Sequence, residues 1–278
     1  MRNYYLSAIF FLLFLLVGIY QSYSQTDTEF WFGVPDITCG HGGSCAPPAA
    51  DVGGEPIYLR IATLELESEI RVEIGDNRVL VQPDTLIPPY TSFTIDLTPF
   101  IDELENFNYG VVEEKALHVT GSNKITAYFE EAEYYNPDIY SLKGSNALGT
   151  EFYTPFQNEW SNGNYTPQPY SGFIITATQN NTTVNLNLTS GIFNDPGGTI
   201  VLDKGETFSC VANSTAGPNH LAGSHVTSDK PIAITIYDDS STHPAVPSHC
   251  RDLIGDQIVP TDAIGQEYIA MRGELNSH

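Results

Sequence analysis

The feature that most constrains the fold is the regular alternation of apolar and polar residues in short runs. The stretch YLRIATLELESEIRVEI from Tyr58 alternates in this way, and so does TTVNLNLTSGI from Thr182. Because successive side chains of a strand point to opposite faces, this period predicts strands with one buried face. Turn signals such as GDN, DPGG and DKGE separate the runs, and only PFIDEL suggests a helical turn. The prediction is an all-β fold of antiparallel β-sandwiches.

The chain also repeats itself. A common phrase recurs as TEFWFGVP from Thr28, TEFYTPFQ from Thr150 and QEYIAMRG from Gln266. A second phrase, His-Val-Thr, begins at His118 and at His225 and is followed each time by an alternating strand and a long acidic loop. Conserved order at a fixed, domain-sized period indicates tandem units. We therefore expect one β-sandwich at 25–148, a second at 149–264, and the start of a third at 265–278, as in a fragment of a longer protein.

The first 24 residues have the parts of a secretory signal peptide. Arg2 precedes the apolar run AIFFLLFLLVGI, which is shorter than the ~20 residues that a membrane-spanning helix needs. Small residues, Ser22 and Ser24, then precede Gln25, as a cleavage site requires. The alternative is an uncleaved anchor. Cleavage predicts a chain that is secreted or held at the cell surface, with no membrane span afterwards.

Charge excludes one class of partner. The chain has 11 basic and 34 acidic residues, for a net charge of −23. Such a surface repels phosphate backbones, so we expect no nucleic acid partner. Hydrophobic residues make up 41% of the chain, which is enough for a folded core and argues against disorder.

With the repeated phrases in view, the chain resembles the N-terminal module of the IgG Fc-binding protein family. The version it resembles most is that of exported Bacteroidetes surface proteins of the gliding-motility and type IX secretion kind. HVTSDKPIAITIYDDSSTHP from His225 and CRDLIGDQIVPTDAIGQEYIA from Cys250 carry the resemblance. It implies a large secreted or cell-surface protein, and it supplies no catalytic residues and no matched Fc-binding residues.

Four cysteines in an exported chain favour disulfides. Cys39 and Cys45 flank a glycine-rich loop, and Cys210 lies in the same unit as Cys250. We expect the bridges Cys39–Cys45 and Cys210–Cys250. The alternative for the first pair is a metal site that includes His41.

The loop that follows Tyr237 contains reactive residue types. Asp238 and Asp239 offer the oxygen ligands that calcium uses, whereas His243, His249 and Cys250 lack the spacing of a compact zinc site. We interpret it as a structured surface loop without a cofactor, with calcium at Asp238 and Asp239 as the alternative.

Catalysis is not expected. Neighbouring carboxylates such as Glu130 and Glu131 would point to opposite faces of a strand, and the chain contains no Gly-x-Ser-x-Gly, Walker or His-Glu-x-x-His motif. The acidic loop of the first unit also lacks the histidines and cysteine of the second.

Two aromatic-rich loops are the best candidates for ligand binding, because loops on a rigid scaffold present binding residues. Their candidate residues are Tyr134, Tyr135, Tyr140, Trp160, Tyr165 and Tyr170. These rings could instead cover the junction between the units. The leading hypothesis is a non-catalytic binding or adhesion module for an extracellular glycan or protein. The alternatives are a calcium-dependent carbohydrate-binding or carbohydrate-degrading protein and a structural spacer.

Overall fold

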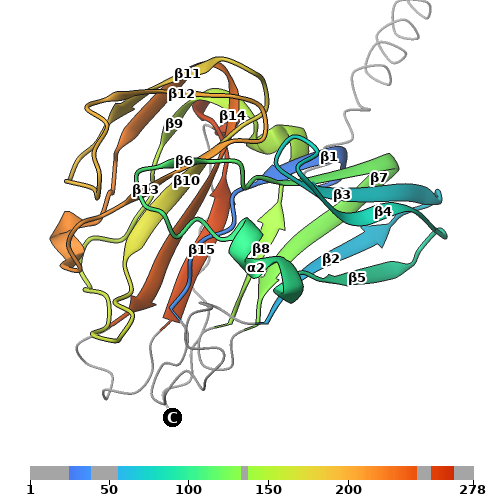
Figure 1. The fold of residues 1–278 in the computed structure, drawn as a ribbon, viewed down its shortest axis with the longest axis horizontal. Helices are drawn as coiled ribbons and strands as arrows, with labels where there is room; N and C mark the ends of the chain where they lie inside the picture. Colours follow the sequence, from blue (N-terminus) through green and yellow to red (C-terminus); the bar gives the residue numbers. More distant parts are fainter. Residues whose placement is uncertain (1–24, 39–55, 133–136, 243–251, 266–278) are drawn as a thin grey trace, which may run out of the picture.

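The protein is all-β and forms two lobes, each built on one antiparallel sheet (Figure 1). The computed structural model describes residues 25–38, 56–132, 137–242 and 252–265. The prediction of antiparallel β-sandwiches is confirmed for these residues, in which each sheet folds around an apolar core.

Most of the first lobe is built from seven strands and short helical turns. Its elements are β1 (Asp27–Phe32), β2 (Ile57–Thr63), β3 (Ser68–Ile74), β4 (Val79–Ile87), β5 (Ser92–Asp96), η2 (Thr98–Phe100), α2 (Ile101–Leu104), β7 (Leu117–Glu131), β8 (Asp138–Leu142) and η3 (Gly144–Ala147). The helical turn expected at PFIDEL is present as η2 and α2.

The second lobe follows in sequence. Its elements are β9 (Gly149–Tyr153), β10 (Ser171–Ala177), β11 (Thr182–Asn187), β12 (Thr199–Leu202), β13 (Thr207–Val211), η4 (Gly217–Asn219), β14 (His225–Ser241), β15 (Asp252–Ile258) and η5 (Thr261–Ala263). The short strand β6 (Val112–Glu113) precedes β7 in sequence but pairs with β13 of this lobe.

One long strand organises each lobe. The first half of β7 pairs with β1 and β3, and its second half pairs with β2 and β8. Gly121 lies between the halves, where an added Cβ would be 2.8 Å from the Ser68 hydroxyl oxygen. In the same way β14 pairs first with β9 and β11 and then with β10 and β15.

The strand pairings of the first lobe therefore recur in the second. Strands β9, β10, β11, β12, β13, β14 and β15 occupy the places of β1, β2, β3, β4, β5, β7 and β8. The unit boundaries at 148 and 264 stay a prediction, as does the third unit, because 266–278 lies outside the described residues. The signal peptide at 1–24 lies outside them too.

The two lobes pack closely against each other. The core of the first lobe includes Ile174, Tyr237 and Leu253 of the second. Gly33 allows close approach, because an added Cβ would lie 2.4 Å from the Cγ2 atom of Ile174. At the junction, buried Gln257 donates to the Trp31 carbonyl oxygen at 2.7 Å. No helix in the described ranges is long and apolar enough to span a membrane.

Candidate functional site

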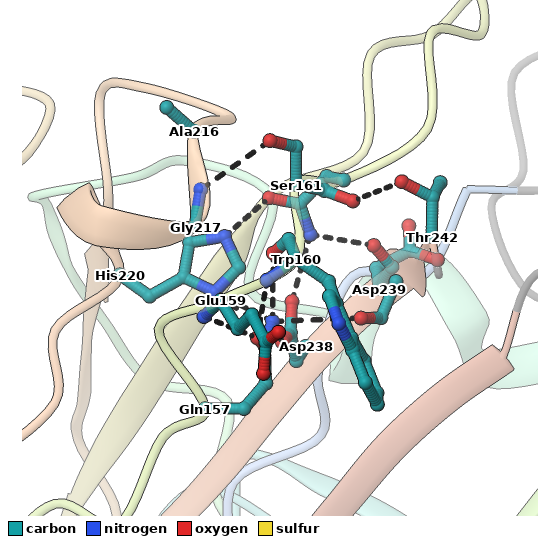
Figure 2. Close-up of polar contacts among 12 residues, drawn as sticks. Gln157, Glu159, Trp160, Ser161, Ala216, Gly217, His220, Asp238, Asp239 and Thr242 are labelled. Carbon is teal, nitrogen blue, oxygen red and sulfur yellow. Dashed lines mark hydrogen bonds and ion pairs between the residues drawn. The ribbon is translucent and has the colours of Figure 1, made fainter. Parts of the chain in front are cut away.

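Polar side chains gather around Asp238, near the end of β14 (Figure 2). Asp238 is buried, and each of its carboxylate oxygens accepts a hydrogen bond from a side-chain amide. Gln157 donates to one oxygen at 2.7 Å, and Asn162 donates to the other at 2.8 Å. Both amides belong to the loop that connects β9 to β10, so the carboxylate fixes that loop to the sheet.

His220, which follows η4, joins the same network from the other side. Its Nε2 atom lies 3.0 Å from the Asn162 amide oxygen, and its Nδ1 atom lies 3.3 Å from Asp238 and 3.1 Å from the Gln157 amide nitrogen. An amide oxygen only accepts, so Nε2 carries a proton and donates to Asn162. The imidazole therefore links two loops to β14 without exposure to solvent.

This network determines how the β9–β10 loop presents Trp160. The Gln157 side-chain oxygen accepts from the backbone N–H groups of Glu159 at 3.0 Å and Trp160 at 2.8 Å. The Ser161 carbonyl oxygen accepts from the Thr242 backbone N–H at 2.9 Å and from its hydroxyl at 2.7 Å. Trp160 is half-buried beside exposed Glu159, so its ring is partly open to solvent on a fixed backbone, while its indole nitrogen is buried.

Asp239 points to the opposite face of β14, toward the junction of the lobes. It accepts from the Thr38 backbone N–H at 2.9 Å and from the Ser240 hydroxyl at 2.7 Å. Burial raises its pKa to about 7, and the nearby Asp36 carboxylate adds to the rise. Burial also raises the pKa of Asp36, which accepts a 2.6 Å hydrogen bond from the Tyr109 hydroxyl.

The alternative of calcium at Asp238 and Asp239 gains no support from this geometry. The two side chains point to opposite faces of one strand, and N–H or O–H donors already occupy their oxygens. Among the described residues, no three His, Cys, Asp or Glu side chains are grouped as a metal site would require. His243, His249 and Cys250 lie outside these residues.

The predicted aromatic residues fall into different settings. Tyr140 is completely buried and packs on Phe32 and Phe129, so the prediction that it presents its ring at the surface is wrong. The short strand β8 begins at Asp138, within the sequence that we expected to be loop. Tyr134 and Tyr135 lie outside the described residues.

Tyr170 covers the junction between the lobes. Its ring makes edge contacts with Tyr109 of the first lobe, at 6.3 Å between centroids, and with Phe193 of the second, at 5.1 Å. Tyr170 therefore fits the alternative that these rings cover the junction between the units better than it fits ligand binding. Trp160 and Tyr165, both half-buried, remain as the aromatic residues of the ligand-binding prediction in the β9–β10 loop.

Cys210 is a free thiol in this structure and is completely buried on β13, where burial raises its pKa well above the usual range. Cys39, Cys45 and Cys250 lie outside the described residues, so both disulfides stay predictions.

Sequence reasoning missed the two glutamate and histidine pairs that the repeated phrases create. The Glu29 carboxylate lies 2.9 Å from the Nε2 atom of His118. Glu151 and His225 repeat this contact at 2.9 Å. The signal was present, because both phrases recur in order, but strand pairing was needed to bring them together.

These features define a class of protein: an all-β module that presents a fixed aromatic loop. The profile of the IgGFc binding protein family matches residues 140–278, half of the chain, and the chain belongs to this family. The family is one of binding domains, and the match includes the β9–β10 loop and all of β14. The resemblance seen in the sequence is thereby confirmed at the level of the family. No curated protein and no solved structure matches the chain.

Proposed function

We propose that this chain is a non-catalytic, extracellular binding module of a larger surface protein. Its ligand is a protein, or a glycan that a protein carries, and it contacts the β9–β10 loop at Trp160 and Tyr165. The proposal includes export of the chain by a signal peptide. It also includes an origin in a Bacteroidetes surface protein that uses type IX secretion.

The observation that carries the proposal is the fixing of the Trp160 loop by Asp238. Gln157 uses its amide nitrogen to bind Asp238 and its amide oxygen to hold the Trp160 backbone. A loop backbone held in this way loses little conformational freedom when a ligand covers it, which favours affinity. The side-chain polar atoms of Gln157, Asn162 and Asp238 all have hydrogen-bond partners within the network. This supports a role in positioning the loop rather than in proton transfer.

The experiment measures binding of immobilised protein to the IgG Fc fragment, with and without its N-linked glycan, and to a printed glycan array. The proposal expects binding to the Fc fragment or to a defined set of glycans. Trp160→Ala should weaken that binding by about tenfold or more, because large aromatic anchors dominate such interfaces. Removal of the Fc glycan separates glycan recognition from protein recognition.

Tyr90→Ala is the matched control, since Tyr90 is an exposed aromatic residue between β4 and β5 of the first lobe. It should bind as the unchanged protein does. Absence of binding to both probes, or an equal loss in both variants, would contradict the assignment of this loop and favour a structural spacer.

A further inference from the structure

The repeated phrases build the same three-residue cluster in both lobes. In the first lobe, Trp31 of β1 stacks on His118 of β7 with ring centroids 3.7 Å apart and planes at 9°. In the second, Tyr153 of β9 stacks on His225 of β14 at 4.4 Å and also at 9°. The aromatic residue and the histidine are directly paired in both sheets. The glutamate two positions before each aromatic residue completes the cluster.

The second lobe covers the cluster of the first lobe. Trp31 is only 3% exposed, and the Lys204 ammonium of the β12–β13 turn lies 5.7 Å from its ring centroid. Lys204 also forms an ion pair with Asp76 at 2.7 Å. The next residue, Gly205, accepts from the Ala116 backbone N–H at 3.2 Å. A lysine and a glycine in one turn thus fit onto the first cluster.

Glycine is required at this turn for two reasons. Gly205 has a φ of +82°, a conformation that L side chains rarely adopt. An added Cβ would also lie 2.4 Å from the backbone nitrogen of Asp76. The turn is therefore adapted to close contact with the neighbouring lobe.

The equivalent cluster of the second lobe is open. Tyr153 is 53% exposed, and the side chain of its partner His225 is 28% exposed, against 10% for His118 of the first cluster. Leu148, which precedes β9, packs beside Trp31, whereas Ile264, in the corresponding place after η5, is 49% exposed. The aromatic ring that the junction buries in one lobe, and the apolar residue that it partly buries, are both exposed in the other.

We propose that the face formed by Glu151, Tyr153, His225 and Ile264 is the docking surface for a further β unit of the same fold. That unit would insert a Lys-Gly turn equivalent to Lys204–Gly205, with its ammonium over the Tyr153 ring. The junction between the two lobes is the template, since the same surface on the first lobe already receives such a turn. The sequence supports this occupant, because the phrase that opens a unit recurs from Gln266.

A second copy of the chain fits this face less well. Its own Lys204 is already placed over Trp31. The corresponding turn of its first lobe, between β4 and β5, has Pro89 and Tyr90 in place of the lysine and the glycine. That turn has no cation for the aromatic ring, and a tyrosine stands where close contact requires glycine. The proposed contact is head-to-tail and does not involve the Trp160 loop.

The test extends the chain. In the extended protein, residues 25–264 are followed directly by a second copy of residues 149–264. The added copy carries Tyr153→Ala, so that only the original Tyr153 is measured. Hydroxyl-radical footprinting compares its modification with that in the unextended chain. We expect the modification of Tyr153 to fall in the extended protein, because its exposed fraction should drop from 53% toward the 3% of the covered Trp31.

A matched variant changes Lys204→Glu and Gly205→Val in the added copy alone, which leaves the original junction intact. It should restore the modification of Tyr153, while circular dichroism confirms that the added copy is folded. The proposal is overturned if a folded added copy leaves Tyr153 as exposed as before, or if the matched variant protects it equally. Protection that appears in the unextended chain as its concentration rises would also overturn it, by showing self-association.

Discussion

Replacement of Asp239 by asparagine should stabilise the protein at neutral and alkaline pH and change little near pH 4. Burial raises the pKa of this carboxyl to about 7, whereas an aspartate in the unfolded chain has a pKa of about 3.9. Between these values the folded protein binds a proton that the unfolded chain has released. Stability therefore falls as pH rises through this window, and the loss is complete above pH 7.

The magnitude follows from the width of the window. About three pH units at ~1.4 kcal/mol each give about 4 kcal/mol of lost stability above pH 7. Asparagine stays neutral and keeps most of the geometry. Its amide oxygen accepts from Thr38 as the carboxylate does at 2.9 Å, and its amide nitrogen donates to Ser240 once that hydroxyl rotates.

The assay is urea unfolding of both proteins at about pH 4.5, 6 and 7.5. The difference in unfolding free energy should grow with pH in favour of Asp239→Asn. Asp102→Asn is the control, because Asp102 is exposed, and its difference from the parent protein should not follow this course. A constant difference for Asp239→Asn across the three values would refute the assignment of a raised pKa to this residue.

Three further predictions concern the junction and the core. Gln257→Ala should cost about 3 kcal/mol, since it leaves the Trp31 carbonyl and the Lys143 N–H without their bonds to this side chain, while exposed Gln179→Ala should cost little in the same urea assay. Gly255→Ala should lower the free energy of unfolding by ~1–3 kcal/mol, because its Cβ would lie 2.1 Å from the buried Tyr140 hydroxyl oxygen. In thermal unfolding, the double variant with Tyr140→Ala should lose less stability than the sum of the two single variants, because the clash is then absent. Cys210 should resist iodoacetamide in the native protein, because burial both shields the thiol and raises its pKa. Intact mass after labelling of the denatured protein without reductant then distinguishes a free thiol from the Cys210–Cys250 bridge. Rapid labelling of Cys210 in the native protein would contradict its burial.

Much of the fold was predictable from local pattern. Strands β2, β3 and β11 lie where alternation and turn signals indicated them. Strand β4 was missed because it contains Pro83, which removes a backbone donor; the strand lies at a sheet edge and pairs with β3 through irregular register. The partition of β7 and β14 between two sets of neighbours is a tertiary property, and no local signal reports it.

The candidate site was only partly predictable. The sequence indicated the β9–β10 loop, but it did not show that Asp238 holds this loop through Gln157 and Asn162, which are 81 and 76 residues away. It also placed Tyr140 in a loop, because the aromatic residues of AEYYNPDIY look alike without knowledge of burial. Asp238 and Asp239 read as a pair of ligands in sequence, whereas their strand sends them to opposite faces.

The long strands β7 and β14 have a mechanical consequence. Among the described strands, each is the only one that pairs with both sets of neighbours in its lobe, so neither set is removed without disturbing hydrogen bonds of the other. A pulling force applied between the ends of the chain is therefore shared across a whole lobe instead of peeling strands one by one. We expect each lobe to yield in a single step under tension.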